Sequence, residues 1–211
     1  MVTGVIAIVI AYLVGSIPAA YIVTRLLTGK DIRRLGGGNV GARNVFQEVG
    51  LAPAIAVGIF DVGKGAAAVA IAQWLLGAPP LFVLLAGLAA VAGHIWSIYL
   101  KFTGGNGLAP TMGVLSVLMP RELLIALAIT VVLIVFTRNT ILSVNISLLS
   151  VPVSTWLLEK LWLFVVFSIV LIIMLVLHFL PTAKAALVKA GSREKFFAEL
   201  LRINKAKKEK R

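Results

Sequence analysis

Seven stretches of apolar residues follow one another along this chain, and most are long enough, or nearly so, to cross a lipid bilayer. The hydrocarbon core of a bilayer is about 30 Å thick, which an α-helix of about 20 residues spans. The fourth stretch is shorter than this, so we expect it to be a half-span or a tilted helix buried in protein. The stretches are residues 2–24, 51–76, 81–100, 108–119, 122–136, 140–158 and 161–180.

The composition agrees with a membrane protein, because 60% of the residues are hydrophobic and only 13% are charged. A soluble domain has about 45–50% apolar and about 25% charged residues, so the excess apolar surface must face lipid. We therefore predict an all-α fold: a polytopic membrane helix bundle with seven transmembrane segments, one of them short. The absence of cysteine excludes a disulfide scaffold and thiolate metal sites, and with two histidines and eight acidic residues we expect no metal.

The basic residues that give the net charge of +12 lie where they would fix the orientation of a membrane protein. We therefore expect no binding to nucleic acid. If the C-terminus is cytoplasmic, seven of the 20 Lys and Arg residues lie in inner connections and ten lie in residues 182–211. Only Arg121 and Lys160 then lie outside. We predict a multi-pass protein of the cell membrane with its N-terminus outside, an integral domain at residues 1–181 and a basic amphipathic tail at 182–211. Residues 2–24 lack a basic leading region, so we expect a retained helix rather than a cleaved signal peptide.

The inner connection at residues 29–50 is rich in glycine. Glycine adopts backbone conformations closed to other residues, so consecutive amides can form a concave anion site. A flexible basic connector that contacts anionic lipid head groups is the alternative. The candidate ligands are Gly36, Gly37, Gly38, Asn39, Gly41 and Asn44, with Arg33, Arg34 and Arg43 nearby.

A second glycine-rich turn contains Gly104, Gly105 and Gly107 and directly precedes the fourth apolar stretch. A helix N-terminus attracts anions because its first amides are unpaired and the helix dipole is positive there. Lys101 supplies a cation just before this turn. The alternative is a tight interhelical turn in which Lys101 extends to the membrane surface.

Two charged residues and both histidines of the apolar stretches are candidates for a polar site. Asp61 and Lys64 are three residues apart, so on a helix they share one face and can pair. Each charge at the bilayer centre costs roughly 2.5–3.5 kcal/mol, so the pair is either part of a polar site or a structural lock between helices. His94 and His178 lie near the inner ends of the third and seventh stretches and are candidates for the same polar site.

In their order and spacing these motifs resemble the bacterial membrane acyl-phosphate:glycerol-3-phosphate acyltransferase (PlsY) family. The resemblance extends over nearly the whole chain. It rests on Gly15-Ser16-Ile17-Pro18, Asp31-Ile32-Arg33, Gly36-x-Gly38-Asn39-Val40-Gly41-Ala42-x-Asn44-Val45, Asp61-x-x-Lys64-Gly65, Gly93-His94, Lys101-Phe102-x-Gly104-Gly105-x-Gly107 and His178.

The resemblance implies a seven-span inner-membrane enzyme whose glycine-rich motifs bind phosphate on the cytoplasmic side. It implies acyl transfer from acyl phosphate to glycerol 3-phosphate, giving lysophosphatidate and inorganic phosphate in phospholipid biosynthesis. Membrane lipid is a further partner, and no cofactor is expected because acyl phosphate is already activated. We predict that Lys101, His94 and His178 are catalytic, with a histidine or the phosphate itself receiving the hydroxyl proton. The predicted phosphate ligands are Gly36, Gly38, Asn39, Gly41, Asn44, Asp61, Lys64, Gly104, Gly105 and Gly107.

Several positions depart from the usual motifs of that family. Gly37 stands in place of a serine, Gln47 of an arginine, and Thr103 and Asn106 of lysines, while Pro181 interrupts the polar continuation after His178. These replacements would remove charge-assisted contacts to the substrates. A second hypothesis is therefore open, in which the chain is a catalytically impaired paralogue that binds lipid or acyl phosphate. A small transporter or channel is a third, weaker hypothesis, because no inverted repeat is apparent.

Overall fold

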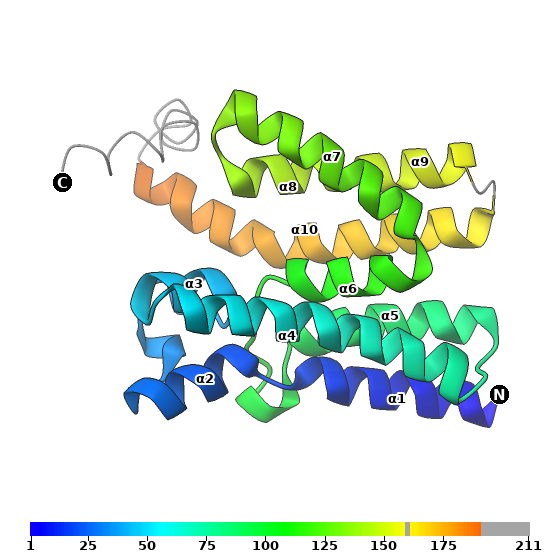
Figure 1. Cartoon of the computed structure of the whole chain (residues 1–211), viewed down its shortest axis with the longest axis horizontal. Coiled ribbons are helices and arrows are strands. Elements are labelled where there is room, and N and C mark those ends of the chain that lie inside the picture. Colours follow the sequence, from blue (N-terminus) through cyan, green and yellow to red (C-terminus); the bar gives the residue numbers. More distant parts are fainter. Residues whose placement is uncertain (159–160, 191–211) are drawn as a thin grey trace. The chain divides into compact units, whose positions relative to one another are not determined.

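The computed structural model describes residues 1–158 and 161–190, in which the regular secondary structure is helical and no strand occurs. The chain forms two compact units that divide after Pro120. The first unit contains α1 (Val2–Ser16), α2 (Ala19–Thr28), α3 (Ala42–Glu48), α4 (Leu51–Ala70), α5 (Pro80–Ile95) and α6 (Leu108–Leu118), with short turns η1 (Ile32–Arg34), η2 (Ile71–Leu75) and η3 (Ile98–Leu100). The helices α7 (Pro120–Thr137), α8 (Thr140–Leu148), α9 (Ser150–Leu158) and α10 (Trp162–Ala190) follow (Figure 1).

Each expected apolar stretch contains helix. Five helical segments are long and apolar enough to cross a membrane: Val2–Thr28, Leu51–Leu75, Pro80–Leu100, Pro120–Thr137 and Trp162–Leu180. The two other apolar segments, Leu108–Leu118 and Leu142–Leu158, are shorter. The fourth stretch is thus short, as the sequence indicates, and the all-helical membrane fold is confirmed.

The first stretch is not one helix that ends before Arg25, as the sequence analysis expected. α1 ends at Ser16, and α2 begins at Ala19 and continues to Thr28, where Gly29 adopts a left-handed conformation. Pro18 causes the break, because proline has no amide hydrogen and disfavours helical geometry in the residue before it. Ile17 accordingly has an extended ψ of 117°.

The third stretch also ends earlier than expected, at Ile95 rather than residue 100. The chain after α5 folds back onto the end of this helix. The Gly105 amide donates a hydrogen bond of 3.1 Å to the His94 carbonyl, and the Tyr12 hydroxyl donates one of 2.7 Å to the Trp96 carbonyl. These long-range partners satisfy carbonyls that a helix end leaves unpaired.

Glycines allow the helices of the first unit to pack closely. The helices α1, α4, α5 and α6 lie side by side (Figure 1). A methyl group on Gly15 would overlap with the backbone of Ala90, and one on Gly93 would overlap with Tyr12, so α1 and α5 approach each other reciprocally. Gly65 and Gly113 allow the same approach between α4 and α6. Small residues of this kind let membrane helices pack backbone to backbone.

Hydroxyl pairs join helices of the second unit. Thr130 bonds Ser147, and Thr137 Oγ1 lies 2.9 Å from Ser143 Oγ, which links α7 to α8. α9 packs against α10. α10 continues through residue 181, where we expected the integral domain to end, and residues 191–211 of the predicted tail lie outside the described residues. The division of the chain at residue 181 stays a prediction.

We predict that Gly93→Ala destabilises the protein by about 1–3 kcal/mol, because the added methyl group meets backbone atoms of α1 that cannot move aside. The measurement is thermal unfolding in detergent. Gly63→Ala is the control, since no atom lies within 4 Å of a methyl group at this helical position. This control variant should melt at the wild-type temperature or slightly above it. Equal melting temperatures for the two variants would contradict the packing described.

Candidate active site

A buried ion pair on α4 lies against the break between α1 and α2. Lys64 Nζ lies 2.8 Å from Asp61 Oδ1 and donates a hydrogen bond of 2.8 Å to the Ile17 carbonyl. Both charged side chains are 3% exposed. The predicted pairing of Asp61 with Lys64 is confirmed. The Lys64 ammonium also provides a hydrogen-bond donor to a carbonyl at the break that Pro18 causes.

His94 completes this group on α5, and we call Asp61, Lys64 and His94 the charged cluster. His94 Nδ1 lies 3.5 Å from Asp61 Oδ1. Just beyond α5, Ser97 Oγ donates a hydrogen bond of 2.6 Å to the Ser16 carbonyl. The end of α1 is therefore held by side chains from two other parts of the first unit.

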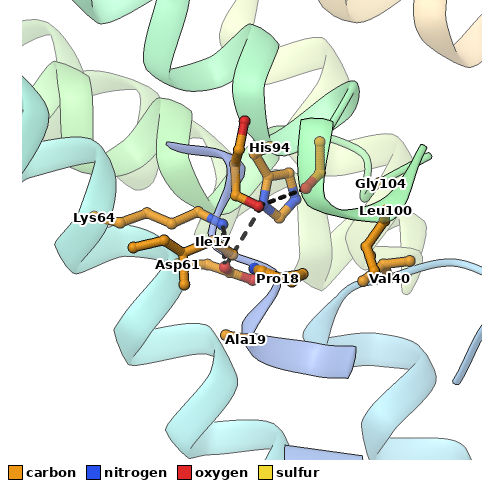
Figure 2. A pocket seen from close by; sticks show the side chains of 11 residues that line it. Ile17, Pro18, Ala19, Val40, Asp61, Lys64, His94, Leu100 and Gly104 are labelled. Atoms are coloured by element: carbon orange, nitrogen blue, oxygen red, sulfur yellow. Dashed lines mark hydrogen bonds and ion pairs between the residues drawn. The ribbon is translucent and has the colours of Figure 1, made fainter. Parts of the chain in front are cut away.

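The charged cluster borders a cavity of about 10 Å³ (Figure 2). A cavity of this size is close to the smallest that can hold one water-sized group. Ser16 lies in its wall, and the Ser16 hydroxyl is buried without a hydrogen-bond partner among the described residues. Val40 and Gly104 also line this cavity, so it reaches both glycine-rich segments.

The first glycine loop (residues 36–44) and the second glycine loop (residues 104–107) contact each other. The Val40 amide donates a hydrogen bond of 3.4 Å to the Gly104 carbonyl. Gly105 lies between Val40 and the imidazole of His94 so tightly that a methyl group there would overlap with both. The structure thus brings both candidate anion segments to one place beside His94.

Asn44 acts as an internal support of the first glycine loop. Its side-chain amide donates hydrogen bonds to the carbonyls of Ile32, Leu35 and Asn39 at 3.0–3.3 Å, and its oxygen accepts one from the Gly37 amide. Asn44 is 4% exposed. Asn44 therefore holds the loop together, and its predicted role as a phosphate ligand stays a prediction.

The glycines of the two loops adopt left-handed backbone conformations or take part in backbone hydrogen bonds. Gly36 and Gly38 have φ of 52° and 71°, and Gly107 precedes α6 with φ of 81°, conformations that L-residues rarely adopt. The amides of Gly38 and Gly105 donate to the carbonyls of Leu35 and His94. The carbonyl of Gly41 accepts from the first turn of α3.

An ion pair precedes the first glycine loop. Arg33 Nη2 lies 2.7 Å from Asp31 Oδ2, and the Arg33 amide donates to Asp31 Oδ1. The side-chain hydrogen bond from Arg33 lowers the pKa of Asp31 below its ordinary value. The pair consequently stabilises the fold above the pKa of the unfolded carboxyl group, and this contribution is lost as the pH falls through the lowered pKa. Arg34 and Arg43 are exposed.

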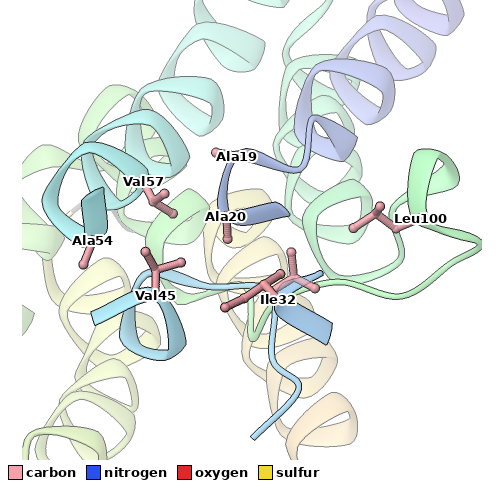
Figure 3. Close-up of a cluster of buried hydrophobic side chains, with 8 residues drawn as sticks. Ala19, Ala20, Ile32, Val45, Ala54, Val57 and Leu100 are labelled. Atoms are coloured by element: carbon pink, nitrogen blue, oxygen red, sulfur yellow. The ribbon is translucent and has the colours of Figure 1, made fainter. Parts of the chain in front are cut away.

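A cluster of buried apolar side chains anchors the first glycine loop to the helices (Figure 3). Val40 and Val45 pack there with Val57 of α4, and Leu100 brings in the segment before the second loop. The remaining members are Ala19, Ala20, Ile32 and Ala54. Burial of these side chains fixes the backbone of both loops relative to α4.

Lys101 lies at a strained turn before the second glycine loop. Lys101 and Phe102 have φ of 56° and 60°, and such left-handed conformations cost about 1–3 kcal/mol each for residues other than glycine. The Phe102 amide donates a hydrogen bond of 2.8 Å to the Ser97 carbonyl, which supports the turn. Lys101 is exposed at the edge of the loop.

One of the predicted site residues is part of the second unit. His178 lies on α10 in the second unit, and its catalytic role stays a prediction. Ser16 and Pro18 were recognised only as motif residues and Ser97 was not predicted, although all three line the cavity. Pro18 was a signal of the helix break that could have been used. Among the described residues, no three His, Cys, Asp or Glu side chains are grouped as a metal site requires.

The comparisons with known proteins agree on one family. A family model described as glycerol-3-phosphate acyltransferase matches residues 5–186. Glycerol-3-phosphate acyltransferase 1 of Dehalococcoides mccartyi (strain 195) is 45% identical over 155 residues, covering 71% of this chain and 74% of that protein.

Two crystal structures of PlsY, described as an integral membrane glycerol 3-phosphate acyltransferase, are similar in fold. The lysophosphatidic acid form superposes with a TM-score of 0.77 at 24% identity, covering 88% of this chain and 92% of that chain. The glycerol 3-phosphate form superposes with a TM-score of 0.71 at 27% identity, covering 85% and 92%.

We predict that Lys64→Met lowers the free energy of unfolding by about 3–5 kcal/mol, because it leaves the buried Asp61 carboxylate without its cation. Thermal or denaturant unfolding in detergent measures this loss. Adding Asp61→Asn should restore most of the stability, since both charges are then removed together. If Lys64→Met alone unfolds like wild type, the ion pair does not hold α4 to the helix break.

Proposed function

Because this chain belongs to the glycerol-3-phosphate acyltransferase family, we propose that it transfers a fatty acyl group from acyl phosphate to glycerol 3-phosphate, in the first acylation of phospholipid biosynthesis. The products are lysophosphatidate and inorganic phosphate. No cofactor is required, since the acyl group of an acyl phosphate is already activated. Membrane lipid surrounds the helices and receives the product.

The contact between the two glycine loops is the observation that carries this proposal. Val40 and Gly104 join the loops at the cavity that the charged cluster borders. The reaction brings together two phosphate-bearing molecules, so it needs positive charge and amide donors on two neighbouring segments. Exposed cations and polar groups surround the loops, namely Arg34, Arg43, Lys101 and Asn106.

The chemical step needs orientation more than a protein nucleophile. The glycerol 3-phosphate hydroxyl oxygen attacks the acyl carbonyl carbon, the new ester bond forms, and the bond from that carbon to the phosphate oxygen breaks. The phosphate leaves with the electron pair, and the hydroxyl proton passes to a base. His94 is a candidate base because Asp61 lies beside its Nδ1 and its Nε2 lies against the second glycine loop. The departing phosphate and His178 are the alternatives.

We further propose seven membrane crossings, with the N-terminus outside and the loops and C-terminus in the cytoplasm. The excess of basic residues in the connections and the tail supports this orientation. Five helices of spanning length and two shorter apolar segments provide the crossings. In this orientation the two glycine loops face the cytoplasm, where glycerol 3-phosphate is available, while the acyl chain stays in the bilayer.

We predict that the purified protein in detergent releases one phosphate for each lysophosphatidate formed from acyl phosphate and glycerol 3-phosphate. Lys101→Ala should lower kcat/KM by about 10- to 100-fold, because a hydrogen bond to a charged group contributes about 1.5–3 kcal/mol. Lys30→Ala, an exposed lysine outside the two glycine loops, is the matched control and should keep wild-type activity. An acyl thioester offered as donor should give no product.

Absence of phosphate release above a protein-free reaction would contradict the enzyme proposal. The catalytically impaired paralogue is then the alternative, and one observation favours it: the replaced positions Gly37, Gln47, Thr103 and Asn106 are all exposed. Ligand contacts can be lost at exposed positions without loss of the fold. If the chain binds acyl phosphate but does not consume it, the chain is this catalytically impaired paralogue.

The topology is tested separately with reporter fusions. We predict that a C-terminal fusion to a reporter active only in the cytoplasm is active, and that a C-terminal fusion to alkaline phosphatase, which needs an oxidising compartment, is inactive. Fusion of the same two reporters after residue 158, in a connection expected outside, should give the opposite pattern. If each reporter has the same activity at the C-terminus and after residue 158, the proposal of seven crossings is wrong.

A further inference from the structure

The turn before the second glycine loop has a conformation that its sequence does not favour. The turn runs from Leu100 to Thr103, and its central residues Lys101 and Phe102 have φ of 56° and 60°. Turns in which both central residues have positive φ are formed mostly by glycine, asparagine and aspartate, because a Cβ atom is crowded in this conformation. Lysine and phenylalanine are not among these residues, so surrounding contacts must hold the turn.

The carbonyls that hold the turn belong to buried residues of the first unit. The Phe102 amide donates a hydrogen bond of 2.8 Å to the Ser97 carbonyl. The Thr103 amide donates one of 3.3 Å to the Leu100 carbonyl, which is longer than most bonds of an amide donor. Ser97 is buried and bonds the Ser16 carbonyl, and Leu100 is buried in the apolar cluster. The acceptors are thus fixed, whereas the backbone bond that closes the turn is long.

Thr103 closes the turn a second time with its side chain. Thr103 Oγ1 donates a hydrogen bond of 2.6 Å to the same Leu100 carbonyl. This bond is much shorter than the bond of the Thr103 amide, and it spans both left-handed residues. If the turn opened, the bond would be lost. The hydroxyl therefore offsets part of the cost of the two left-handed conformations.

The conformation of the turn decides where the Lys101 side chain lies. A left-handed residue directs its Cβ atom differently from a residue in helical or extended backbone. Lys101 is exposed at the edge of the second glycine loop, where the proposed function uses its charge for a phosphate-bearing substrate. If the backbone of the turn relaxed, the charge would remain on the protein but would leave this position.

We propose that Thr103 is a positioning residue, whose hydroxyl holds the strained turn that presents Lys101 to the phosphate-bearing substrate. This inference rests on the proposed function. Thr103 acts through Lys101 and does not contact the reacting atoms. A direct hydrogen bond from the exposed Thr103 side chain to the substrate is the alternative, and the experiment separates the two.

The first measurement is phosphate release from acyl phosphate and glycerol 3-phosphate by the full chain in detergent. Thr103→Val removes the hydroxyl but keeps the shape of the side chain, and it should lower kcat/KM by about 5- to 10-fold, the effect of one hydrogen bond. Thr103→Ser keeps the hydroxyl and should stay within about twofold of wild type. In a Lys101→Ala protein, Thr103→Val should cause no further loss, because its effect requires the lysine side chain.

The second measurement relieves the strain at the exposed residue Phe102. Phe102→Gly allows the left-handed conformation at this position without steric cost, so Thr103→Val should lower kcat/KM by a smaller factor in this protein. Phe102→Ala is the matched control, because it removes the same side chain but keeps the Cβ atom and the strain. In the Phe102→Ala protein, Thr103→Val should have its full effect.

The third measurement does not depend on turnover. Amide hydrogen exchange without any ligand reports how often the turn opens. Thr103→Val should speed exchange in residues 97–105, whereas Thr103→Ser should exchange like wild type. Unchanged exchange in Thr103→Val would overturn the inference, since the hydroxyl would then not hold the turn.

Failure of the positioning role and failure of the proposed function give different results. If wild type releases phosphate but Thr103→Val has wild-type kcat/KM, or causes the same further loss in the Lys101→Ala protein, only the positioning role is wrong. Equal losses in the Phe102→Gly and Phe102→Ala proteins would also overturn this role and indicate direct contact with the substrate. If wild type releases no phosphate, the proposed function is wrong, and the positioning role falls with it.

Discussion

The buried pair of Asp61 and Lys64 is the interaction on which the first unit depends. Neither charge can remain in an apolar bundle alone, so each needs the other, and Lys64 also needs an acceptor, which the Ile17 carbonyl provides. Pro18 makes that carbonyl available by interrupting the helix. The same carboxylate lies beside His94. Through Lys64 the pair thus bonds α4 to the end of α1, and through Asp61 it lies beside the imidazole of His94.

Glycine has two distinct roles in this arrangement. In the helices, Gly15, Gly93 and Gly113 allow the backbones of α1 and α5, and of α4 and α6, to approach each other closely. In the loops, glycine allows left-handed turns and the contact of Gly105 with His94. The amides of Gly38 and Gly105 already donate to protein carbonyls. The proposed phosphate binding would therefore rely on the exposed edge of the loops and its basic side chains more than on a complete ring of glycine amides.

Patterns within one segment could be predicted from the sequence, whereas contacts between distant segments could not. Apolar length predicts the helices, and the three-residue spacing predicts the pairing of Asp61 with Lys64. The break at Pro18 has a local cause and was overlooked. The support that Asn44 gives to the loop depends on the carbonyls of Ile32, Leu35 and Asn39, which turn toward it only in the folded chain. The end of α5 at Ile95 likewise depends on partners far away in the sequence. A repeating pattern of apolar residues does not indicate which distant residues come into contact.

The central claim is that both glycine loops bind the same phosphate-bearing molecule next to the charged cluster. Amide hydrogen exchange, followed by mass spectrometry with and without glycerol 3-phosphate, tests it most directly, because a bound ligand slows exchange in the backbone that it contacts. The account predicts slower exchange in residues 36–44 and 104–107 together, at the same ligand concentration, with no change in the connection between α7 and α8. Protection of one loop without the other, or of neither, would contradict it.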